Sequence, residues 1–333
     1  HVNDFDWSPD GATLAFSFAP NPKINDAGLE SDISTIPADS GKVTSLVKRP
    51  GVDVSPMYSP DGKWIAGGGL YQSRMHLFDS ATGRVVSESQ AARDLLTALA
   101  YSPDGKAIAV GYQNGVVECF DVKGRGGKPS LFEHPRVIDA HQGMVEGMCF
   151  VDRNQLATSG KDGLIKIWSL HSSARRQFNF DNGPLRDVAL SPDGTLLACA
   201  YVDEFIIANL SHEIVAKLHP RSPQSVAWSP ASDRVAVCSD SFEATVFDRR
   251  GNRLFDIPHP DLPEHVTFSA DGRFVAVIGQ THLQVCEAST GREVDRYRLS
   301  SPKGGKTVAF SHSGQYLAYG DRSGAIFVRD LRS

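Results

Sequence analysis

Residues 101–121, YSPDGKAIAVGYQNGVVECFD, hold the pattern that decides the fold. Ser102-Pro103-Asp104-Gly105 predicts a tight turn, because proline presets φ, aspartate suits the third turn position and glycine accepts a left-handed conformation. The KAIAVGY run that follows is rich in small and β-branched residues and predicts a strand. Gln113-Asn114-Gly115 contains the Asn-Gly pair typical of hairpins, and VVECFD predicts a further strand. The unit is therefore strand, turn, strand, turn, strand.

Similar units recur along the whole chain. The equivalent turn positions are Ser8, Ser59, Ser102, Val151, Ser191, Ser229, Ser269 and Ser311. Their spacings run from 38 to 51 residues, and the mean of about 43 lies within the ~40–45-residue range of a four-stranded propeller blade. Because one blade cannot bury both of its faces alone, neighbouring blades must stack. The sequence predicts an all-β propeller of eight four-stranded antiparallel blades, with seven blades as the alternative if the irregular first unit packs differently.

One copy, DAHQGMVEGMCFVDRNQLATSGKDGLIKIWSL from Asp139 to Leu170, resembles a repeat of the WD40 family. His141 stands at the histidine of the family's Gly-His pair, Thr158 at the strand hydroxyl, Asp162 in the turn and Trp168 at the tryptophan. The resemblance implies a structural tetrad in which the indole N–H, hydroxyl, imidazole and carboxylate form one hydrogen-bonded chain. The set is similar in composition to a catalytic site, but the blade pattern already explains its spacing.

The other copies depart from this pattern. We expect the tryptophan position to be filled by Phe78, Phe120, Phe247 and Val328 in other units, so most blades lack the full tetrad. The first two units also resemble the propeller of prolyl-oligopeptidase-type serine peptidases, over about the first 80 residues. The chain contains no G-x-S-x-G nucleophile motif, so a peptidase site is not expected in these residues.

Composition indicates a globular chain, with 41% hydrophobic and 22% charged residues among 333. The net charge of −5 argues against a broad nucleic-acid surface, and no apolar run is long enough for a membrane helix. We expect one β-propeller domain over residues 1–333, excerpted from a longer chain, because strands that should complete the first and last units are missing.

Five cysteines lie in separate predicted strands: Cys119, Cys149, Cys199, Cys238 and Cys286. We expect buried free thiols, which fit a reducing compartment and a cytoplasmic location. The closest histidine sets are His134 with His141 and His259 with His265, with proline-rich loops between them, and we expect no metal there. Motifs for zinc, nucleotide phosphates and dinucleotides are absent from the sequence, so no cofactor is expected.

The turns between second and third strands share one face of a WD40-type propeller with the loops that join outer to first strands, and in the family this face commonly binds peptides or partner domains. The candidate partner-binding residues are Tyr71, Arg74, Tyr112, Gln113, Lys161, Phe242, His282 and Arg322. Tyr71 and Tyr112 could equally be strand ends packed between blades. An apolar ring at a turn tip is costly unless covered, so we expect Phe242 to fold back over its own blade, with partner contact as the alternative.

These observations predict a non-enzymatic interaction scaffold that binds a protein or peptide on the loop-ringed face. No nucleic-acid or membrane partner is expected. The alternative is a regulatory or substrate-gating propeller domain of a larger enzyme such as a serine peptidase.

Overall fold

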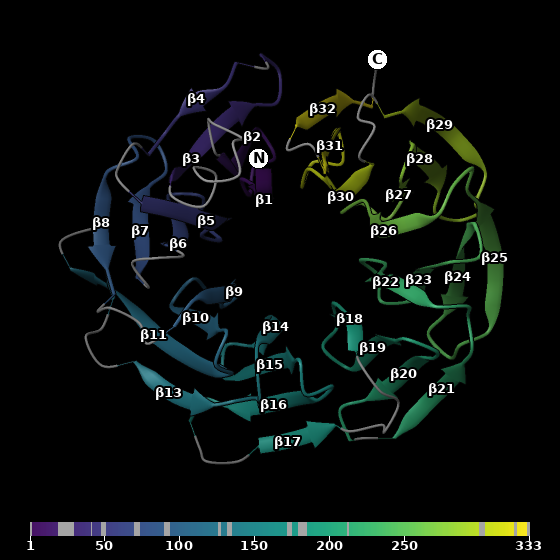
Figure 1. The fold of residues 1–333 in the computed structure, drawn as a ribbon, viewed down its shortest axis with the longest axis horizontal. Coiled ribbons are helices and arrows are strands. Elements are labelled where there is room, and N and C mark those ends of the chain that lie inside the picture. Colours follow the sequence, from purple (N-terminus) through teal and green to yellow (C-terminus); the bar gives the residue numbers. More distant parts are fainter. Residues whose placement is uncertain are drawn as a thin grey trace. The chain divides into compact units, whose positions relative to one another are not determined.

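The computed structural model describes residues 2–18, 30–40, 42–47, 51–69, 74–89, 94–125, 128–131, 135–171, 175–178, 185–211, 213–299, 304–322 and 325–331. These residues form strands and turns, and none of them lies in a helix. The chain divides into two compact units, His1–Phe178 and Asn179–Ser333, with four consecutive blades in each (Figure 1). The fold is the predicted eight-bladed β-propeller, and the seven-blade alternative is wrong.

The first unit contains blades 1 to 4. Its strands are β1 (Val2–Trp7), β2 (Thr13–Phe18), β3 (Glu30–Pro37) and β4 (Thr44–Ser45) in blade 1; β5 (Gly51–Tyr58), β6 (Trp64–Gly69), β7 (Met75–Asp79) and β8 (Val85–Glu88) in blade 2; β9 (Leu96–Tyr101), β10 (Ala107–Tyr112), β11 (Val116–Arg125), β12 (Lys128–Leu131) and β13 (Arg136–Asp139) in blade 3; and β14 (Val145–Asp152), β15 (Gln155–Gly160), β16 (Ile165–Ser169) and β17 (Arg175–Phe178) in blade 4.

The second unit contains blades 5 to 8. Its strands are β18 (Leu185–Leu190), β19 (Leu196–Tyr201), β20 (Phe205–Asn209) and β21 (Ile214–Leu218) in blade 5; β22 (Pro223–Trp228), β23 (Arg234–Ser239), β24 (Glu243–Asp248) and β25 (Arg253–Pro258) in blade 6; β26 (Pro263–Phe268), β27 (Phe274–Gly279), β28 (His282–Glu287) and β29 (Glu293–Arg298) in blade 7; and β30 (Gly305–Phe310), β31 (Tyr316–Asp321) and β32 (Ile326–Asp330) in blade 8.

Strands within a blade pair antiparallel in chain order, with two departures in the first unit. A short parallel pairing of β3 with β5 joins the sheets of blades 1 and 2. In blade 3, β11 is long enough to pair with β13 along its first half and with β12 along its second half.

The turn between the first and second strands is held by its serine, a role that the sequence pattern did not indicate. In blade 3, Ser102 Oγ accepts a hydrogen bond from Ala107 N at 2.9 Å and donates one to Asp104 Oδ1 at 2.8 Å. Gly105 has a φ of +68°, as the turn requires. The same pair of serine bonds recurs at Ser8, Ser59, Ser191 and Ser269. The turn is therefore a repeated hydrogen-bonded unit that fixes the register of the two strands.

The hydrophobic core lies between consecutive blades of a unit. In the first unit, Leu77 of blade 2 packs in one cluster with Leu99 and Ile108 of blade 3. In the second, Ile207 of blade 5 packs with Val235 of blade 6. Burying one such side chain contributes about 1.5–3 kcal/mol. Blades are stable because their neighbours cover both faces, which explains why second strands such as β19 and β23 are buried almost throughout.

Two expectations from the sequence are wrong in detail. Cys149 is exposed on β14, whereas Cys199, Cys238 and Cys286 are buried thiols as expected. In blade 8, β31 pairs Leu317 with Arg329, so Arg329 and not Val328 occupies the register position that Trp168 has in blade 4.

Candidate functional site

In both units, the turn between second and third strands is hydrogen-bonded to loops that precede first strands. In the first unit, Lys161 N donates to Met144 O at 2.9 Å, and His141 N donates to Gly115 O at 2.9 Å. In the second, Asp240 N donates to Arg221 O at 2.9 Å. These bonds place the turns and the loops on the same face of each unit, and they hold the turn tips in fixed positions.

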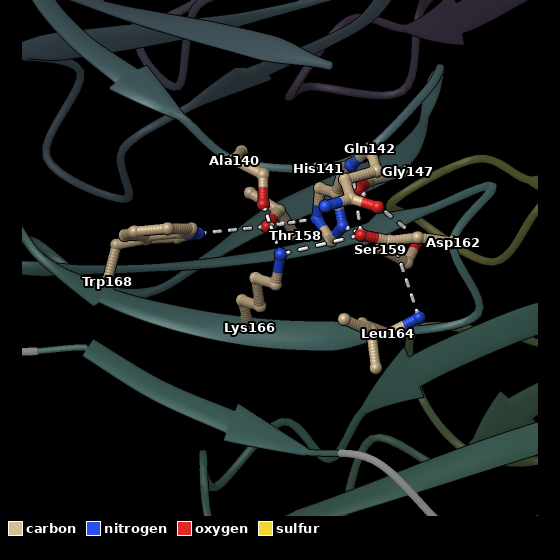
Figure 2. Close-up of polar contacts among 10 residues, drawn as sticks. All are labelled: Ala140, His141, Gln142, Gly147, Thr158, Ser159, Asp162, Leu164, Lys166 and Trp168. Atoms are coloured by element: carbon tan, nitrogen blue, oxygen red, sulfur yellow. Dashed lines mark hydrogen bonds and ion pairs between the residues drawn. The ribbon is translucent and has the colours of Figure 1, made fainter. Parts of the chain in front are cut away.

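The four residues of the tetrad lie in one continuous chain in blade 4 (Figure 2). Trp168 Nε1 lies 3.0 Å from Thr158 Oγ1, His141 Nε2 lies 2.8 Å from the same oxygen, and His141 Nδ1 lies 2.8 Å from Asp162 Oδ1. β15 and β16 supply the hydroxyl and the indole, the turn between them supplies the carboxylate, and the loop before β14 supplies the imidazole. The chain therefore ties a loop, a turn and two strands together.

The direction of each hydrogen bond follows from the groups at the two ends of the chain, which are a donor and an acceptor. The indole N–H only donates and the Asp162 carboxylate only accepts, so Thr158 accepts from Trp168 and donates to His141 Nε2, while Nδ1–H donates to Asp162. Burial lowers the pKa of His141 below its ordinary value, which keeps the ring neutral as this chain needs. Burial alone would raise the pKa of Asp162, but hydrogen bonds from Gln142 N and His141 bring it below its ordinary value.

Lys166 is a fifth member that sequence reasoning missed. Its Nζ atom donates to Ala140 O at 2.5 Å and lies 3.4 Å from Asp162 Oδ2, as Figure 2 shows. The only signal for it was a lysine inside the apolar run IKIW of a third strand. Its charge offsets that of the half-buried carboxylate.

The tetrad is arranged to hold a blade together. Thr158 is 1% exposed and its hydroxyl is already bonded on both sides, so a substrate cannot reach it as a nucleophile. Among the described residues, no group of histidine, cysteine and carboxylate side chains is arranged to hold a metal ion.

Comparisons with known proteins agree with this geometry. The family described as "WD domain, G-beta repeat" matches residues 132–169, which contain the tetrad. Among solved structures, the chain is similar to the C-terminal WD40 domain of Sif2, with a TM-score of 0.79 over 99% of this chain and 95% of that chain, at 16% identity. The chain has the fold of a WD40 propeller, and one of its repeats matches the WD40 family.

Curated relatives are similar to the chain over part of their length. The chain is 26% identical over 258 residues to Minichromosome loss protein 1 of Schizosaccharomyces pombe, covering 72% of this chain and 30% of that protein. It is 27% identical over 188 residues to the Intraflagellar transport protein 80 homolog of Mus musculus, covering 54% of this chain and 24% of that protein. The chain thus spans under a third of the length of these relatives.

A second histidine of the WD40 propeller takes the same place in its blade as His141. His259 lies four residues before β26, as His141 lies four residues before β14. Its Nδ1–H donates to Asp261 O at 2.9 Å, but its Nε2 atom is buried without a hydrogen-bond partner among the residues that the structure describes. The strand position of Thr158 is filled by Val277, so the hydroxyl is missing. The position of His259 ahead of its first strand could have identified it.

Asp261 joins the loop and the turn of blade 7, as Asp162 joins those of blade 4, but Asp261 lies in the loop instead of the turn. Asp162 lies in the turn and accepts from Gln142 N in the loop at 3.1 Å. Asp261 lies in the loop and accepts from Gln280 N at 2.7 Å and Thr281 N at 2.9 Å in the turn. Either arrangement uses one carboxylate to join the loop and the turn.

The candidate partner-binding residues of the first unit have different surroundings. Tyr71 lies outside the described residues. Tyr112 ends β10 in the core, is 3% exposed and donates its hydroxyl hydrogen to Glu118 Oε2 at 2.8 Å, so it offers almost no surface to a partner. Arg74 pairs with Glu88 at 3.0 Å. Gln113 and Lys161 are exposed at turn tips.

In the second unit, Phe242 stands out. Its side chain is 56% exposed, so the expectation that the ring folds back over its own blade is wrong. His282 begins β28, with Nδ1 3.2 Å from Asp261 Oδ2. Arg322 is exposed and forms an ion pair with Glu264.

Proposed function

We propose that this WD40 propeller is a non-enzymatic interaction scaffold that binds a protein or peptide through the face that carries the turns between second and third strands. The observation that carries the proposal is the combination of fixed backbone and free side chains there. The turn backbones are hydrogen-bonded to neighbouring loops, while Gln113, Lys161 and Phe242 extend into solvent. A preorganised surface loses little conformational entropy when a partner binds.

The charge and shape of these tips fit a protein partner. In the second unit, Arg322 and Phe242 offer a guanidinium and an aromatic ring, which are kinds of side chain enriched at protein interfaces. Lys161 adds an exposed cation on the first unit. The similar proteins include the intraflagellar transport protein named above. A further one is the Guanine nucleotide-binding protein G(I)/G(S)/G(T) subunit beta-1 of Homarus americanus, which is 26% identical over 136 residues, covering 40% of this chain and 36% of that protein. The second name is that of a subunit, which by definition binds other proteins, and we extend a protein-binding role to this chain as part of the proposal.

The test compares partners captured by the wild-type chain with those captured by a face variant carrying Lys161→Ser, Phe242→Gly and Arg322→Ser. A control variant carries Val137→Thr and Val294→Thr on outer strands, where both valines are exposed. Cross-linking and mass spectrometry should show a partner that the wild type and the control retain and the face variant loses. Identical partners for all three proteins, or turnover of a small substrate without any partner, would contradict the proposal.

The described residues contain no helix that is long and apolar enough to cross a membrane. The cytoplasmic location expected from the cysteines stays a prediction. The role in a larger enzyme that the resemblance of the first two units to peptidase propellers suggests also stays a prediction.

A further inference from the structure

Phe242 occupies a turn position that other blades fill with glycine. Between the second and third strands, the turns of blades 3 and 6 have three residues and the turn of blade 4 has four. The third residue of these turns is Gly115, Phe242 and Gly163, respectively. All three adopt a left-handed backbone, with φ values of +85°, +74° and +59°. Glycine adopts this conformation without a steric cost, whereas a bulky side chain does so rarely.

Phe242 therefore opposes the stability of the fold in two ways. A left-handed residue with a side chain costs on the order of 1–2 kcal/mol relative to its ordinary conformation. The ring is also 56% exposed, so it gains little from burial. Since neither the turn nor the core requires a phenylalanine here, its presence is better explained by a contact with another molecule.

Phe242 lies in a turn that borders a groove between blades 5 and 6. Ser241 and Glu243, its two neighbours in the chain, both line a cavity of about 340 Å³. The loop between β21 and β22 also lines the groove, through His219, Pro220 and Arg221. The groove lies within the second unit, and all its lining residues are described.

Arg221 is the cation of this groove that lacks an anionic partner. His219 Nδ1 lies 3.8 Å from Glu204 Oε1, and Arg253 pairs with Glu243 at 3.7 Å and with Asp256. Arg221 is exposed and forms no ion pair with any residue that the structure describes. A free guanidinium in a partly enclosed groove favours a carboxylate ligand.

The walls of the groove are held in place by hydrogen bonds that leave the Arg221 side chain free. Asp240 N donates to Arg221 O at 2.9 Å, which joins the turn to the loop. Gln224 Nε2 donates to Asp240 Oδ1 at 2.9 Å, and Gln224 Oε1 accepts from Arg186 at 2.5 Å. The loop and the turn therefore present Phe242 and Arg221 from a fixed frame.

We propose that this groove binds a partner segment that carries an aspartate or glutamate next to a large apolar side chain, the carboxylate meeting Arg221 and the apolar group packing on Phe242. The inference rests on the proposed function and adds the position and chemistry of the ligand.

The test is a selection of a phage-displayed library of random short peptides on the wild-type chain, followed by fluorescence anisotropy with the enriched peptides. The expected consensus is an acidic residue next to a large apolar one. Phe242→Gly should weaken binding about tenfold or more, as expected for an aromatic anchor. Arg221→Gln should weaken it about two- to fivefold, as expected for one exposed ion pair. Two control variants should bind as the wild type does: Val294→Thr on β29, and Arg273→Gln in the turn between β26 and β27.

The possible outcomes separate this inference from the proposed function. Enriched peptides that bind the Phe242→Gly and Arg221→Gln variants as tightly as the wild type would show that the groove is not their site. The proposed function would then stand, with the peptides bound elsewhere on the propeller. Peptides that bind only with phosphoserine in place of the acidic residue would overturn the carboxylate assignment. A library that yields no enriched peptide would overturn both proposals.

Discussion

His259 has in blade 7 the position that His141 has in blade 4, but only His141 has a hydroxyl within reach of Nε2. The His141 Nε2 atom lies 2.8 Å from Thr158 Oγ1, whereas His259 Nε2 is buried and has no hydrogen-bond partner in the described part of the chain. The register of β27 places Val277 where β15 places Thr158. An unpaired buried acceptor costs about 1–3 kcal/mol, so blade 7 contains a site at which one hydroxyl should stabilise the fold.

Val277→Thr should therefore be neutral or stabilising, although a buried Val-to-Thr change is ordinarily unfavourable. The new hydroxyl has almost the shape of the lost methyl group and can donate to His259 Nε2. Val275→Thr is the matched control, because Val275 is equally buried in the same strand and cluster but lies two residues farther from the turn. We expect Val275→Thr to cost about 1–2 kcal/mol, with both changes measured by urea denaturation. Equal destabilisation by the two variants would show that a hydroxyl at residue 277 does not form a stabilising hydrogen bond with His259 Nε2.

Thr158→Val should be among the most destabilising single changes in blade 4. It removes the acceptor of Trp168 Nε1 and the donor to His141 Nε2 in one step. Each orphaned group costs about 1–3 kcal/mol. The double variant Thr158→Val with Trp168→Phe should lose less than the sum of the two single losses, because the two residues share one bond. Additive losses in a double-mutant cycle would show that the tetrad does not act as a connected chain.

The stability of the propeller should fall as the pH drops below about 6.5, the ordinary pKa of histidine. Burial lowers the pKa of both His141 and His259 in the folded chain. At a pH between the folded and the unfolded histidine pKa values, the unfolded chain therefore binds more protons than the folded chain. The free energy of unfolding thus decreases as the pH falls through that window. Thermal melting between pH 7.5 and pH 5 measures the slope.

The double variant His141→Asn with His259→Asn should flatten this slope while lowering the stability at pH 7.5. A slope unchanged by the two substitutions would assign the acid sensitivity to other groups. Asp162 adds a separate loss at lower pH, because its folded pKa lies below the ordinary 3.8 and its contribution disappears only as that carboxyl is protonated.

The blades could be predicted from the sequence because their signals are local. A Ser-Pro-Asp-Gly turn and the alternation of strand and turn are complete within about twenty residues, and repetition makes each copy support the others. The tetrad could be predicted for a similar reason, since His141, Thr158, Asp162 and Trp168 lie within one repeat.

The surface could not be predicted with the same success, because burial depends on contacts between separate elements. Tyr112 and Phe242 are both aromatic residues at turns between second and third strands. The first is buried at a strand end and the second is exposed. Nothing in either turn sequence distinguishes the two outcomes. The groove beside Phe242 likewise depends on a loop of blade 5 and a turn of blade 6, which are about twenty residues apart in the chain.

Ser102→Ala should destabilise blade 3 by about 1–2 kcal/mol, because Ala107 N loses its buried acceptor. The bond from Ser102 is also the largest cause that lowers the pKa of Asp104, so that pKa should rise toward its ordinary value. NMR titration of the carboxyl and thermal melting check the two effects independently. Lys106→Ala, in the same turn but with an exposed side chain, should change the melting temperature little. It should raise the pKa of Asp104 less than Ser102→Ala does, because it removes only a nearby exposed charge. A Ser102→Ala variant that melts like the wild type and has an unchanged Asp104 pKa would show that the serine does not hold the turn.

Phe242→Gly should raise the free energy of unfolding by about 0.5–1 kcal/mol, although it deletes an entire aromatic side chain. Glycine adopts a φ of +59° without strain, which stabilises the folded chain. This gain exceeds the stability that is lost because glycine gives the unfolded chain more conformational entropy. Phe242→Ala separates the two contributions, because it removes the ring but retains a Cβ atom in the strained conformation. We therefore expect the alanine variant to be less stable than the glycine variant in thermal and urea unfolding. If the order is reversed, the ring contributes to the fold itself, and the argument that it is present for a partner loses its physical basis.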